Sequence, residues 1–212
     1  MTAAPEAETV TVASLAERIR EMAAASPRTI IGIAGPPGAG KSTVAEALVD
    51  ALGPAAALVP MDGFHLSNRV LESLGRRDRK GAPDTFDAAG YIALLRRLRT
   101  PDADIVYAPA FRRDIEEPIG SSIPVPPTTP IVITEGNYLL LDTHPWRQIR
   151  GLIDAAWYLQ IDDAVRVERL VARHVAFDKT PQAARAWAQG SDQRNADIVA
   201  ATARRADLVL RL

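Results

Sequence analysis

The 212-residue sequence contains no cysteine, which excludes disulfide frameworks, zinc–thiolate sites and thiol nucleophiles. Imidazole ligands can come only from His65, His144 and His174. The sequence also lacks an excess of either charge, since its net charge is -1, and this composition does not indicate electrostatic capture of nucleic acid. Partners therefore have to be inferred from local sites.

Long hydrophobic runs are also missing. No apolar stretch approaches the roughly 20 residues that a membrane helix needs. The acidic, alanine-rich residues 1–9 lack the basic start and apolar run of a secretory signal. We therefore expect a cytoplasmic protein with no membrane partner, present as a monomer or homodimer. With 47% hydrophobic and 24% charged residues, its length suits one domain over residues 1–212.

Apolar, β-branched segments alternate with amphipathic ones along the chain. Residues 28–34 (RTIIGIA) are almost continuously apolar, which is typical of a strand buried on both faces of a parallel sheet. The alternation predicts an α/β fold, with helices on both faces of a mostly parallel sheet. Further strands are predicted over 56–61, 105–107, 130–134, 155–161 and 208–212. Helices are predicted over 12–25, 41–52, 87–98 and 164–176, with two more after residue 178 that are broken near Gly190.

Two segments interrupt this alternation. Residues 76–84 (RRDRKGAPD) are basic and contain Gly and Pro, so we expect an exposed loop. Residues 116–130 contain five prolines and predict a loop or an edge hairpin. Both segments are candidates for insertions that face a substrate.

A glycine-rich segment lies between the first buried strand and the next helix, and it matches the pattern G-x-x-x-x-G-K-[ST]. Glycines let successive backbone N–H groups point inward, and the following helix adds the positive end of its dipole. We expect Lys41 to reach the β- and γ-phosphates of a nucleotide and Ser42 to ligate Mg²⁺. The residues predicted to surround the phosphates are Gly35, Pro36, Pro37, Gly38, Ala39, Gly40, Lys41, Ser42 and Thr43.

A phosphate loop does not define a reaction, because such loops occur in GTPases, transporters, motors and kinases. The sequence contains no N-K-x-D segment to read guanine, and the lone D-x-x-G at residues 87–90 is interpreted as a helix start. Signatures of transport and AAA-type ATPases are also missing from it. A kinase acting on a small molecule is therefore favoured.

Two carboxylates follow predicted strands. Asp62, in VPMDGFHL, should face the γ-phosphate and could accept the proton of an attacking hydroxyl, although an Asp before Gly also suits a simple turn. Glu135 ends the apolar run IVITE, where it could serve Mg²⁺ or a substrate hydroxyl, or simply be solvated.

Basic residues offer weaker signals. Arg169 and Arg173 are four residues apart on one face of a predicted helix, where they could cover a triphosphate, while a solvated face remains the common alternative. Arg79 and Lys80 could attract an anionic substrate, although exposed charges need no such role.

Several ordered segments resemble the phosphoribulokinase, uridine kinase and pantothenate kinase superfamily, and within it the fructokinase-like or nucleoside/nucleotide kinase branch. Besides the phosphate loop, they are residues 61–68 (MDGFHLSN), 79–91 (RKGAPDTFDAAGY), 106–114 (VYAPAFRRD) and 134–142 (TEGNYLLLD). The resemblance implies a P-loop NTPase fold of three layers with a five-stranded parallel sheet. It also implies a substrate flap at 76–87 and a lid at 163–190, and helical spacing of apolar residues separately predicts an N-terminal helix within 1–27.

By this resemblance, ATP and Mg²⁺ are the cofactors, Asp62 is the general base, Glu135 is the acidic partner of the metal, and the catalytic Arg173 belongs to a lid with Arg169. The implied substrate side chains are His65, Arg79, Lys80, Tyr107, Phe111 and Asn137.

The sequence departs from the uridine kinases at residues 64–65, where those enzymes usually have Tyr, and at residues 110–113 (AFRR). A sugar is therefore favoured as the small-molecule alcohol, with a nucleoside or pantothenate-like acceptor left open. A regulator that binds ATP without transferring phosphate is the alternative from another class. A nucleic-acid-binding ATPase is disfavoured because basic residues are not concentrated beyond residues 76–80.

Overall fold

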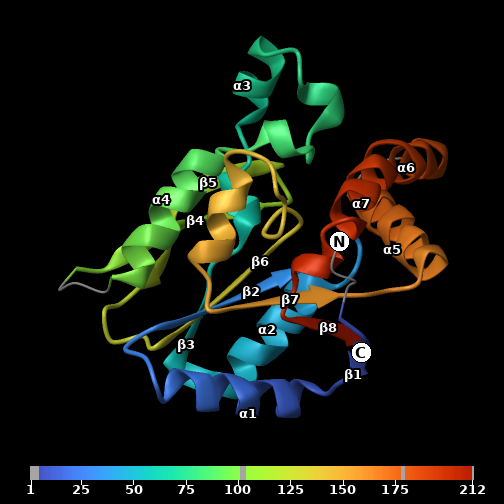
Figure 1. Cartoon of the computed structure of the whole chain (residues 1–212). Coiled ribbons are helices and arrows are strands. Elements are labelled where there is room, and N and C mark those ends of the chain that lie inside the picture. Colours follow the sequence, from blue (N-terminus) through green and yellow to red (C-terminus); the bar gives the residue numbers. More distant parts are fainter. Residues whose placement is uncertain (1–4, 101–103, 178–179, 212) are drawn as a thin grey trace.

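The computed structural model describes residues 5–100, 104–177 and 180–211 (Figure 1). In chain order its elements are β1 (Ala7–Thr9), α1 (Val12–Ala23), β2 (Thr29–Ala34), α2 (Lys41–Leu52), β3 (Ala56–Leu58), α3 (Asn68–Ser73), α4 (Ala88–Arg99), β4 (Val106–Arg112), β5 (Glu117–Val125), β6 (Ile131–Gly136), β7 (Ala155–Leu159), α5 (Asp163–Ala176), α6 (Pro181–Trp187), α7 (Gln193–Ala200) and β8 (Leu208–Arg211). Residues 1–4 of the predicted N-terminal segment, 178–179 of the predicted lid and Leu212 of the last predicted strand lie outside the described residues.

Six strands form one parallel sheet in the order β1-β8-β7-β2-β6-β3. Strand β2 lies inside the sheet between β7 and β6, and all six of its residues are buried, as its apolar sequence predicts. The predicted α/β P-loop fold is thus confirmed, but the implied five strands become six. The additional strand, β1, has only three residues (AET) that are at least partly exposed, so it gives no apolar signal.

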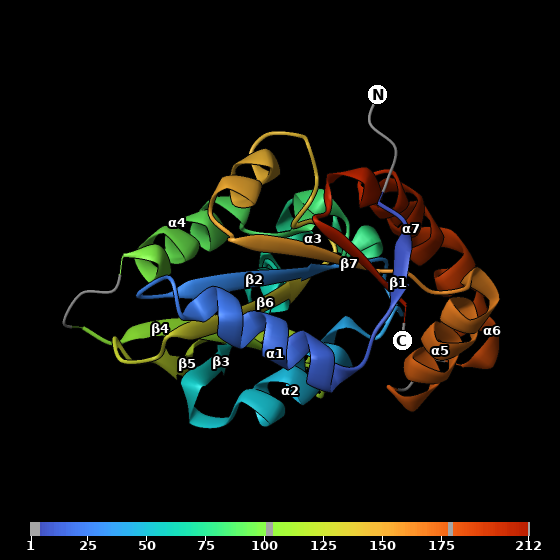
Figure 2. The ribbon, with the colours of Figure 1, turned by 60° about the horizontal axis from the view of Figure 1, so that its bottom comes forward.

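Helices cover both faces of the sheet (Figure 2). Helices α1 and α2 pack on one face, where Leu48 joins a core with Ile31 of β2. Helix α4 and the short helix Trp146–Gly151 cover the other face, where Leu95 packs in a second core with Ile30. Alternating side chains of β2 therefore enter opposite cores, which gives the three layers that the resemblance implies.

The strand predicted over 105–107 does not belong to the parallel sheet. It is the start of β4, which pairs antiparallel with β5 in a separate hairpin. The turn of four residues between them, 113–116, is too short for a parallel crossover, so the two strands must be antiparallel. The proline-rich segment 116–130, predicted as a loop or an edge hairpin, accordingly supplies the second strand of this separate hairpin and a loop after it.

A flap projects between residues 66 and 85. Its base is closed by hydrogen bonds from Leu66 N to Thr85 O (2.9 Å) and from Asp87 N to Phe64 O (2.8 Å). Asp87 then starts α4, because its Oδ1 accepts a hydrogen bond from Gly90 N at 2.8 Å. The D-x-x-G segment is thus a helix start, as its sequence indicates.

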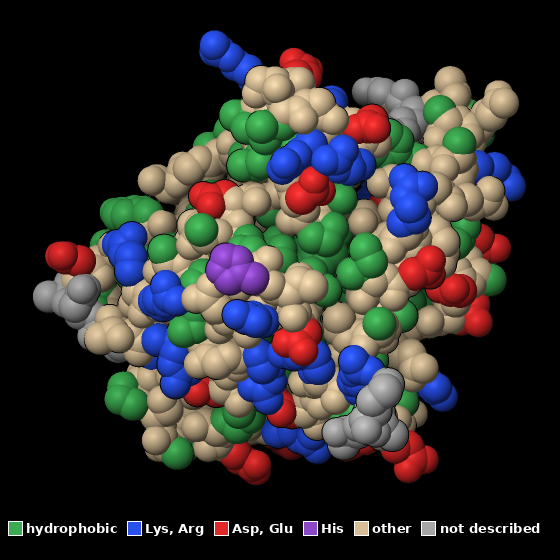
Figure 3. Space-filling model, turned by 45° about the horizontal axis from the view of Figure 1, so that its top comes forward, with side chains coloured by type: hydrophobic (Ala, Val, Ile, Leu, Met, Phe, Trp, Pro, Cys, Tyr) green, Lys and Arg blue, Asp and Glu red, His purple; other side chains and the backbone are tan. Residues whose placement is uncertain are grey.

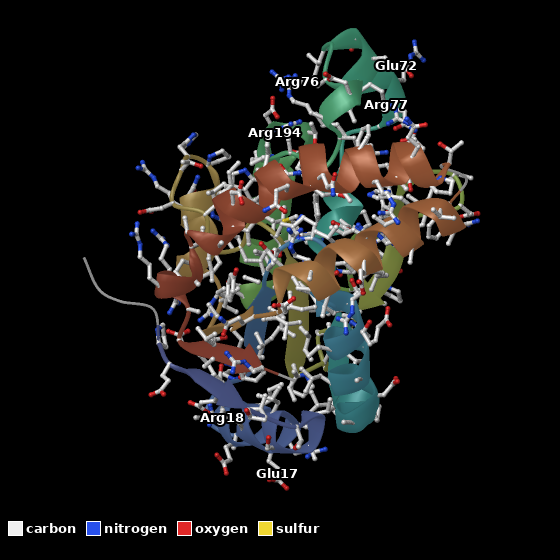
Figure 4. The ribbon with its side chains drawn as sticks, turned by 90° about the vertical axis from the view of Figure 1, so that its right-hand side faces the viewer. Glu17, Arg18, Glu72, Arg76, Arg77 and Arg194 are labelled. Carbon is white, nitrogen blue, oxygen red and sulfur yellow. The ribbon has the colours of Figure 1, made fainter. Side chains whose placement is uncertain are left out.

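Helices α5, α6 and α7 lie together at one end of the sheet; they include the segment predicted as a lid, residues 163–190, and are called the lid below. The break predicted near Gly190 is a π-helical turn, Ala188–Asp192, that joins α6 directly to α7. Figure 4 views this end, with Arg76 and Arg77 of the flap above the lid and Arg194 of α7 on the side nearest to them. Within residues 5–100, 104–177 and 180–211, no helix has the length and apolar character to cross a membrane.

Candidate active site

Three neighbouring strands direct their carboxyl ends to one edge of the sheet. Strand β2 leads into the phosphate loop, β3 leads to Asp62, and β6 carries Glu135 near its end. Because β2, β6 and β3 are parallel neighbours, these three groups meet at the edge where α/β proteins bind ligands. The sheet thus assembles residues that are far apart in the sequence.

The phosphate loop depends on two glycines with left-handed backbone angles, Gly38 (φ 81°) and Gly40 (φ 93°). Gly40 directly precedes α2, so the loop ends at a helix N-terminus. Gly38 also lies against the lid, since a Cβ atom there would come within 2.8 Å of Leu170 Cγ and 2.9 Å of the Arg166 carbonyl oxygen. The loop and α5 are therefore packed directly on each other.

Lys41 is the first residue of α2, and its side chain extends along the loop. Its Nζ donates hydrogen bonds to Asn137 Oδ1 (2.8 Å) and to the Pro36 carbonyl oxygen (3.1 Å). Burial lowers the pKa of Lys41, and the nearby negative charges of Glu135 and Asp62 oppose that effect. An ammonium group held in this way can neutralise phosphate oxygens.

Ser42 and Glu135 form the position expected for a magnesium ion. Ser42 Oγ donates a hydrogen bond of 3.0 Å to Glu135 Oε1. Burial raises the pKa of Glu135, and the neighbouring charge of Asp62 raises it further. The residues that the structure describes include no group of three or more His, Cys, Asp or Glu suited to hold a metal. One hydroxyl and one carboxylate fit Mg²⁺, which usually takes few protein oxygens and completes its shell with phosphates and water.

Asp62 lies in the short helical turn Met61–Phe64, and its backbone holds His65 in place. His65 Nδ1 lies 2.8 Å from the Asp62 carbonyl oxygen. Because a carbonyl only accepts, Nδ1 carries the hydrogen and Nε2 of the neutral ring is left as an acceptor. Burial lowers the pKa of His65. Burial also acts to raise the pKa of Asp62, but electrostatic interactions with His65, Arg113 and Lys41 outweigh it and hold that pKa below its usual range.

Two cavities meet at these residues. The larger, of about 1260 Å³, extends along the phosphate loop and α5, and the smaller, of about 600 Å³, lies between the flap, the hairpin and the lid. On the face shown in Figure 3, hydrophobic side chains are exposed at the centre, with Lys and Arg side chains around them. The residues that line both cavities are Gly38, Lys41, Ser42, Arg113 and Arg173. Any group transferred between the cavities has to pass this junction.

The three arginines of α5 have different surroundings. Arg169 covers the phosphate loop, since its Nη1 would lie 3.4 Å from a Cβ on Gly40. Arg173 lines both cavities, and burial lowers its pKa, as does the charge of Arg113. Arg166 is fully buried and donates from Nε to Asp163 Oδ1 at 2.8 Å. Arg169 and Arg173 are thus placed for a ligand, whereas Arg166 packs the base of α5.

The structure brings together four of the six predicted substrate residues, which line the smaller cavity: His65, Lys80, Phe111 and Asn137. The other two, Arg79 and Tyr107, are not among the described residues that line either cavity. Arg79 pairs with Asp84 at 2.8 Å on the outside of the flap, and Tyr107 is 51% exposed on the hairpin. Gly35 and Pro36 are also set back from both cavities, although the Pro36 carbonyl holds Lys41. These placements do not support a substrate role for Arg79 or Tyr107.

Sequence reasoning missed Arg113 and the His174–Asp192 pair. Arg113 Nη2 lies 3.3 Å from Asp62 Oδ2, and His174 Nε2 lies 2.7 Å from Asp192 Oδ2. The only sequence signal for the first is the Arg-Arg pair in the segment VYAPAFRRD, which does not say which arginine faces inward. The His174–Asp192 pair depends on the π-helical turn, which no sequence pattern indicates.

Comparisons with known proteins agree with this geometry. A model of the phosphoribulokinase/uridine kinase family matches residues 30–178. Escherichia coli (strain K12) YggC is 34% identical over 190 residues, which cover 87% of this chain and 78% of YggC. A Schizosaccharomyces pombe protein, C227.14, whose name proposes a uridine kinase, is 37% identical and the match covers 76% of this chain and 72% of that protein.

A solved structure from Silicibacter sp. TM1040, whose name proposes a fructose transport system kinase, superposes with a TM-score of 0.81. It is 37% identical to this chain, and the match covers 94% of this chain and 98% of that one. The similarity therefore includes the sheet, the flap, the hairpin and the lid.

Proposed function

Because the chain belongs to the phosphoribulokinase/uridine kinase family, we propose that this P-loop kinase phosphorylates a hydroxyl group of a sugar-like metabolite. Kinases of this family use ATP with Mg²⁺, and Lys41, Ser42 and Glu135 are the residues that would hold them here. The observation that carries the proposal is the junction, where Asp62 of the smaller cavity lies beside Arg113, which lines both cavities.

Different residues of the chain have different roles in phosphoryl transfer. Asp62 accepts the proton of the acceptor hydroxyl, and the cations around it keep it ionised and ready to do so. Lys41 and Arg173 neutralise negative charge at the junction, and Arg169 does so above the phosphate loop. Mg-ATP supplies the phosphoryl group and the metal's positive charge.

The smaller cavity favours a neutral, hydroxyl-rich acceptor. Lys80 is already engaged, because its Nζ donates to Asn68 Oδ1 (2.8 Å) and to the Glu116 carbonyl oxygen (2.5 Å). The cavity also carries the carboxylates of Asp78 and Asp192, which accept hydrogen bonds from hydroxyl groups, and the ring of Phe111. The name of the Silicibacter protein supports a sugar such as fructose.

A nucleoside is the second candidate. The S. pombe relative's name proposes uridine as a substrate, and three rings in the cavity could contact a base. His65 lies 4.0 Å from Phe86 and 4.7 Å from Phe111 between ring centroids, and the rings are tilted by 41° and 42°, so these side chains form an aromatic cluster. This candidate predicts turnover of uridine rather than of free sugars.

The test is ADP release, measured with a coupled assay in the presence of Mg-ATP and a panel of fructose, other hexoses, uridine and pantothenate. Turnover of one hexose that Asp62→Ala abolishes, while Mg-ATP binding persists, is the expected result. Ser42→Ala should instead weaken Mg-dependent binding. ADP release that no alcohol stimulates, together with wild-type behaviour of Asp62→Ala, would refute the kinase proposal and favour an ATP-binding regulator.

A further inference from the structure

The turn between β4 and β5 holds two consecutive arginines that face different surroundings. Arg112 is 60% exposed and is bound twice by Asp114, from Nε at 2.8 Å and from Nη2 at 2.5 Å. Arg113 lines both cavities instead, and its Nη2 makes a single contact of 3.3 Å with Asp62 Oδ2. The turn therefore places Arg113 at the junction between the cavities, whereas Asp114 holds Arg112 at the surface.

Three cations gather at the junction. Lys41, Arg113 and Arg173 each line both cavities, so their like charges repel one another. The carboxylates around them are those of Asp62, Glu116, Glu135 and Asp192, which all line the smaller cavity and not the larger one. Cations that crowd together in a partly buried site are stabilised when an additional anion enters.

We propose that Arg113 is a catalytic residue, which leaves Asp62 during the reaction and binds the phosphoryl group in transit. This role rests on the proposed kinase function. In the step, a bond forms between the acceptor oxygen and the γ-phosphorus, the bond from that phosphorus to the oxygen of ADP breaks, and the hydroxyl proton passes to Asp62. The guanidinium neutralises charge on the equatorial phosphoryl oxygens as it frees the carboxylate for the proton.

The geometry suits such an exchange of partners. The contact with Asp62 uses one nitrogen at 3.3 Å, and the Arg113 side chain is 38% exposed, so the ion pair is weak compared with a bidentate one. The Phe111 ring lies 6.0 Å from the guanidinium carbon and limits its movement on one side. Rotation of its side chain can thus move Arg113 from the Asp62 carboxylate to the phosphoryl group, with no change in the hairpin.

The experiment compares binding of MgADP alone with binding of MgADP and fluoroaluminate, a mimic of the phosphoryl group in transit, by isothermal titration. We expect fluoroaluminate to tighten MgADP binding to the wild-type protein. Arg113→Ala should lose about 10²- to 10³-fold of affinity in its presence and keep its affinity for MgADP alone. Arg113→Lys should be intermediate. Arg112→Ala is the matched control and should match the wild type in both titrations.

Equal fluoroaluminate affinity of Arg113→Ala and the wild type would overturn the proposal. The proposal would also be overturned if fluoroaluminate did not tighten MgADP binding to the wild-type protein, because a site with preorganised cations should bind that anion. Retained MgADP binding reports that each variant is folded. Since no acceptor is needed, failure of the sugar assay is a separate result. With an acceptor that turns over, Arg113→Ala should lower kcat and leave KM for ATP unchanged.

Discussion

Asp62 and Glu135 lie at the carboxyl ends of neighbouring strands, yet their pKa values move in opposite directions. Burial dominates at Glu135 and raises its pKa, whereas the cations around Asp62 outweigh burial and lower its pKa. Paired carboxyl groups with separated pKa values commonly have different roles in one reaction. The ionised Asp62 is suited to accept a proton, and Glu135, which accepts a hydrogen bond from Ser42 Oγ, is suited to hold a metal ion.

His65 provides a test of the smaller cavity by pH. Its pKa is lowered by burial, so the neutral ring, with Nε2 as an acceptor, persists to lower pH than in a solvated histidine of pKa 6.5. We expect kcat/KM for the acceptor to stay level as the pH falls through 6.5 and to decline only at more acidic pH. The measurement is a pH profile under conditions where ATP is saturating.

The control for this profile is His65→Gln, which cannot titrate. Its kcat/KM should be lower throughout, and the acidic decline due to the ring should be missing. A wild-type profile that already falls with an apparent pKa of 6.5 or above would contradict the role of His65 as a buried, neutral acceptor.

Single residues are predictable where the chain itself fixes their position. Asp62 and Glu135 can be identified because each lies at or just beyond the end of an apolar strand, and that end must lie at the binding edge of a parallel sheet. Arg113 cannot be chosen over Arg112, because the side of a hairpin that a turn residue faces depends on register. That register is set by tertiary pairing rather than by the local sequence.

At the scale of elements, the contact between the phosphate loop and α5 makes Gly38 a sensitive position. Gly38→Ala would place Cβ 2.8 Å from Leu170 Cγ and 2.9 Å from a backbone oxygen, at a φ of 81° that L-residues rarely adopt. We expect it to lower nucleotide affinity at least tenfold and to reduce the free energy of unfolding by about 2 kcal/mol. Titration with MgADP and thermal unfolding measure the two effects.

Gly53→Ala is the matched control, because Gly53 also has a positive φ (62°) but a Cβ added there would meet no atom within 4 Å. This substitution introduces backbone strain without a steric clash, so it should reduce the free energy of unfolding by about 1 kcal/mol and leave MgADP affinity unchanged. Equal effects of the two variants would show that packing against α5 is unimportant.

The pair of His174 and Asp192 joins α5 to the π-helical turn at the wall of the smaller cavity. The Asp192 side chain is 11% exposed and lines the smaller cavity, so its carboxylate is placed to accept a hydrogen bond from a hydroxyl of the substrate. We expect Asp192→Asn to raise KM for the acceptor about tenfold and to leave KM for ATP unchanged, since a hydrogen bond to a charged group contributes about 1.5 kcal/mol or more. Steady-state kinetics measure both constants.

Asp197→Asn, on the neighbouring α7, serves as the control, because Asp197 is bonded to Gln193 and does not line the smaller cavity. Its kinetics should match the wild type. Unchanged acceptor KM in Asp192→Asn would assign the pair a purely structural role.

Over the whole molecule, the parallel sheet is predictable from the sequence because its inner strands are buried on both faces and read as apolar runs. Strand β1 is not, since its three partly exposed residues pair only through their backbone with β8. The prediction that placed residues 105–107 in the βα alternation is wrong, because β4 begins with an apolar segment that resembles a sheet strand.

Arg28 connects the layers at the edge of the sheet opposite the binding edge. It is 3% exposed, and its guanidinium donates to four carbonyl oxygens. The acceptors are Thr129 (2.9 Å), Leu98 (3.2 Å), Pro126 (2.6 Å) and Pro127 (3.1 Å). A single side chain thereby joins the start of β2, the end of α4 and the segment that leads into β6.

Arg28→Ala should therefore lower the free energy of unfolding by about 3 kcal/mol, because it leaves buried carbonyl groups without donors. Chemical denaturation measures this loss. Strand β2 separates Arg28 from the phosphate loop by roughly 20 Å at about 3.3 Å per residue, so KM for ATP in the folded variant should stay unchanged. Arg18→Ala, which removes only an exposed 3.5 Å pair with Glu8, should be nearly neutral. If Arg28→Ala is as stable as Arg18→Ala, the layers hold together without this connection, and packing of the two cores alone accounts for their arrangement.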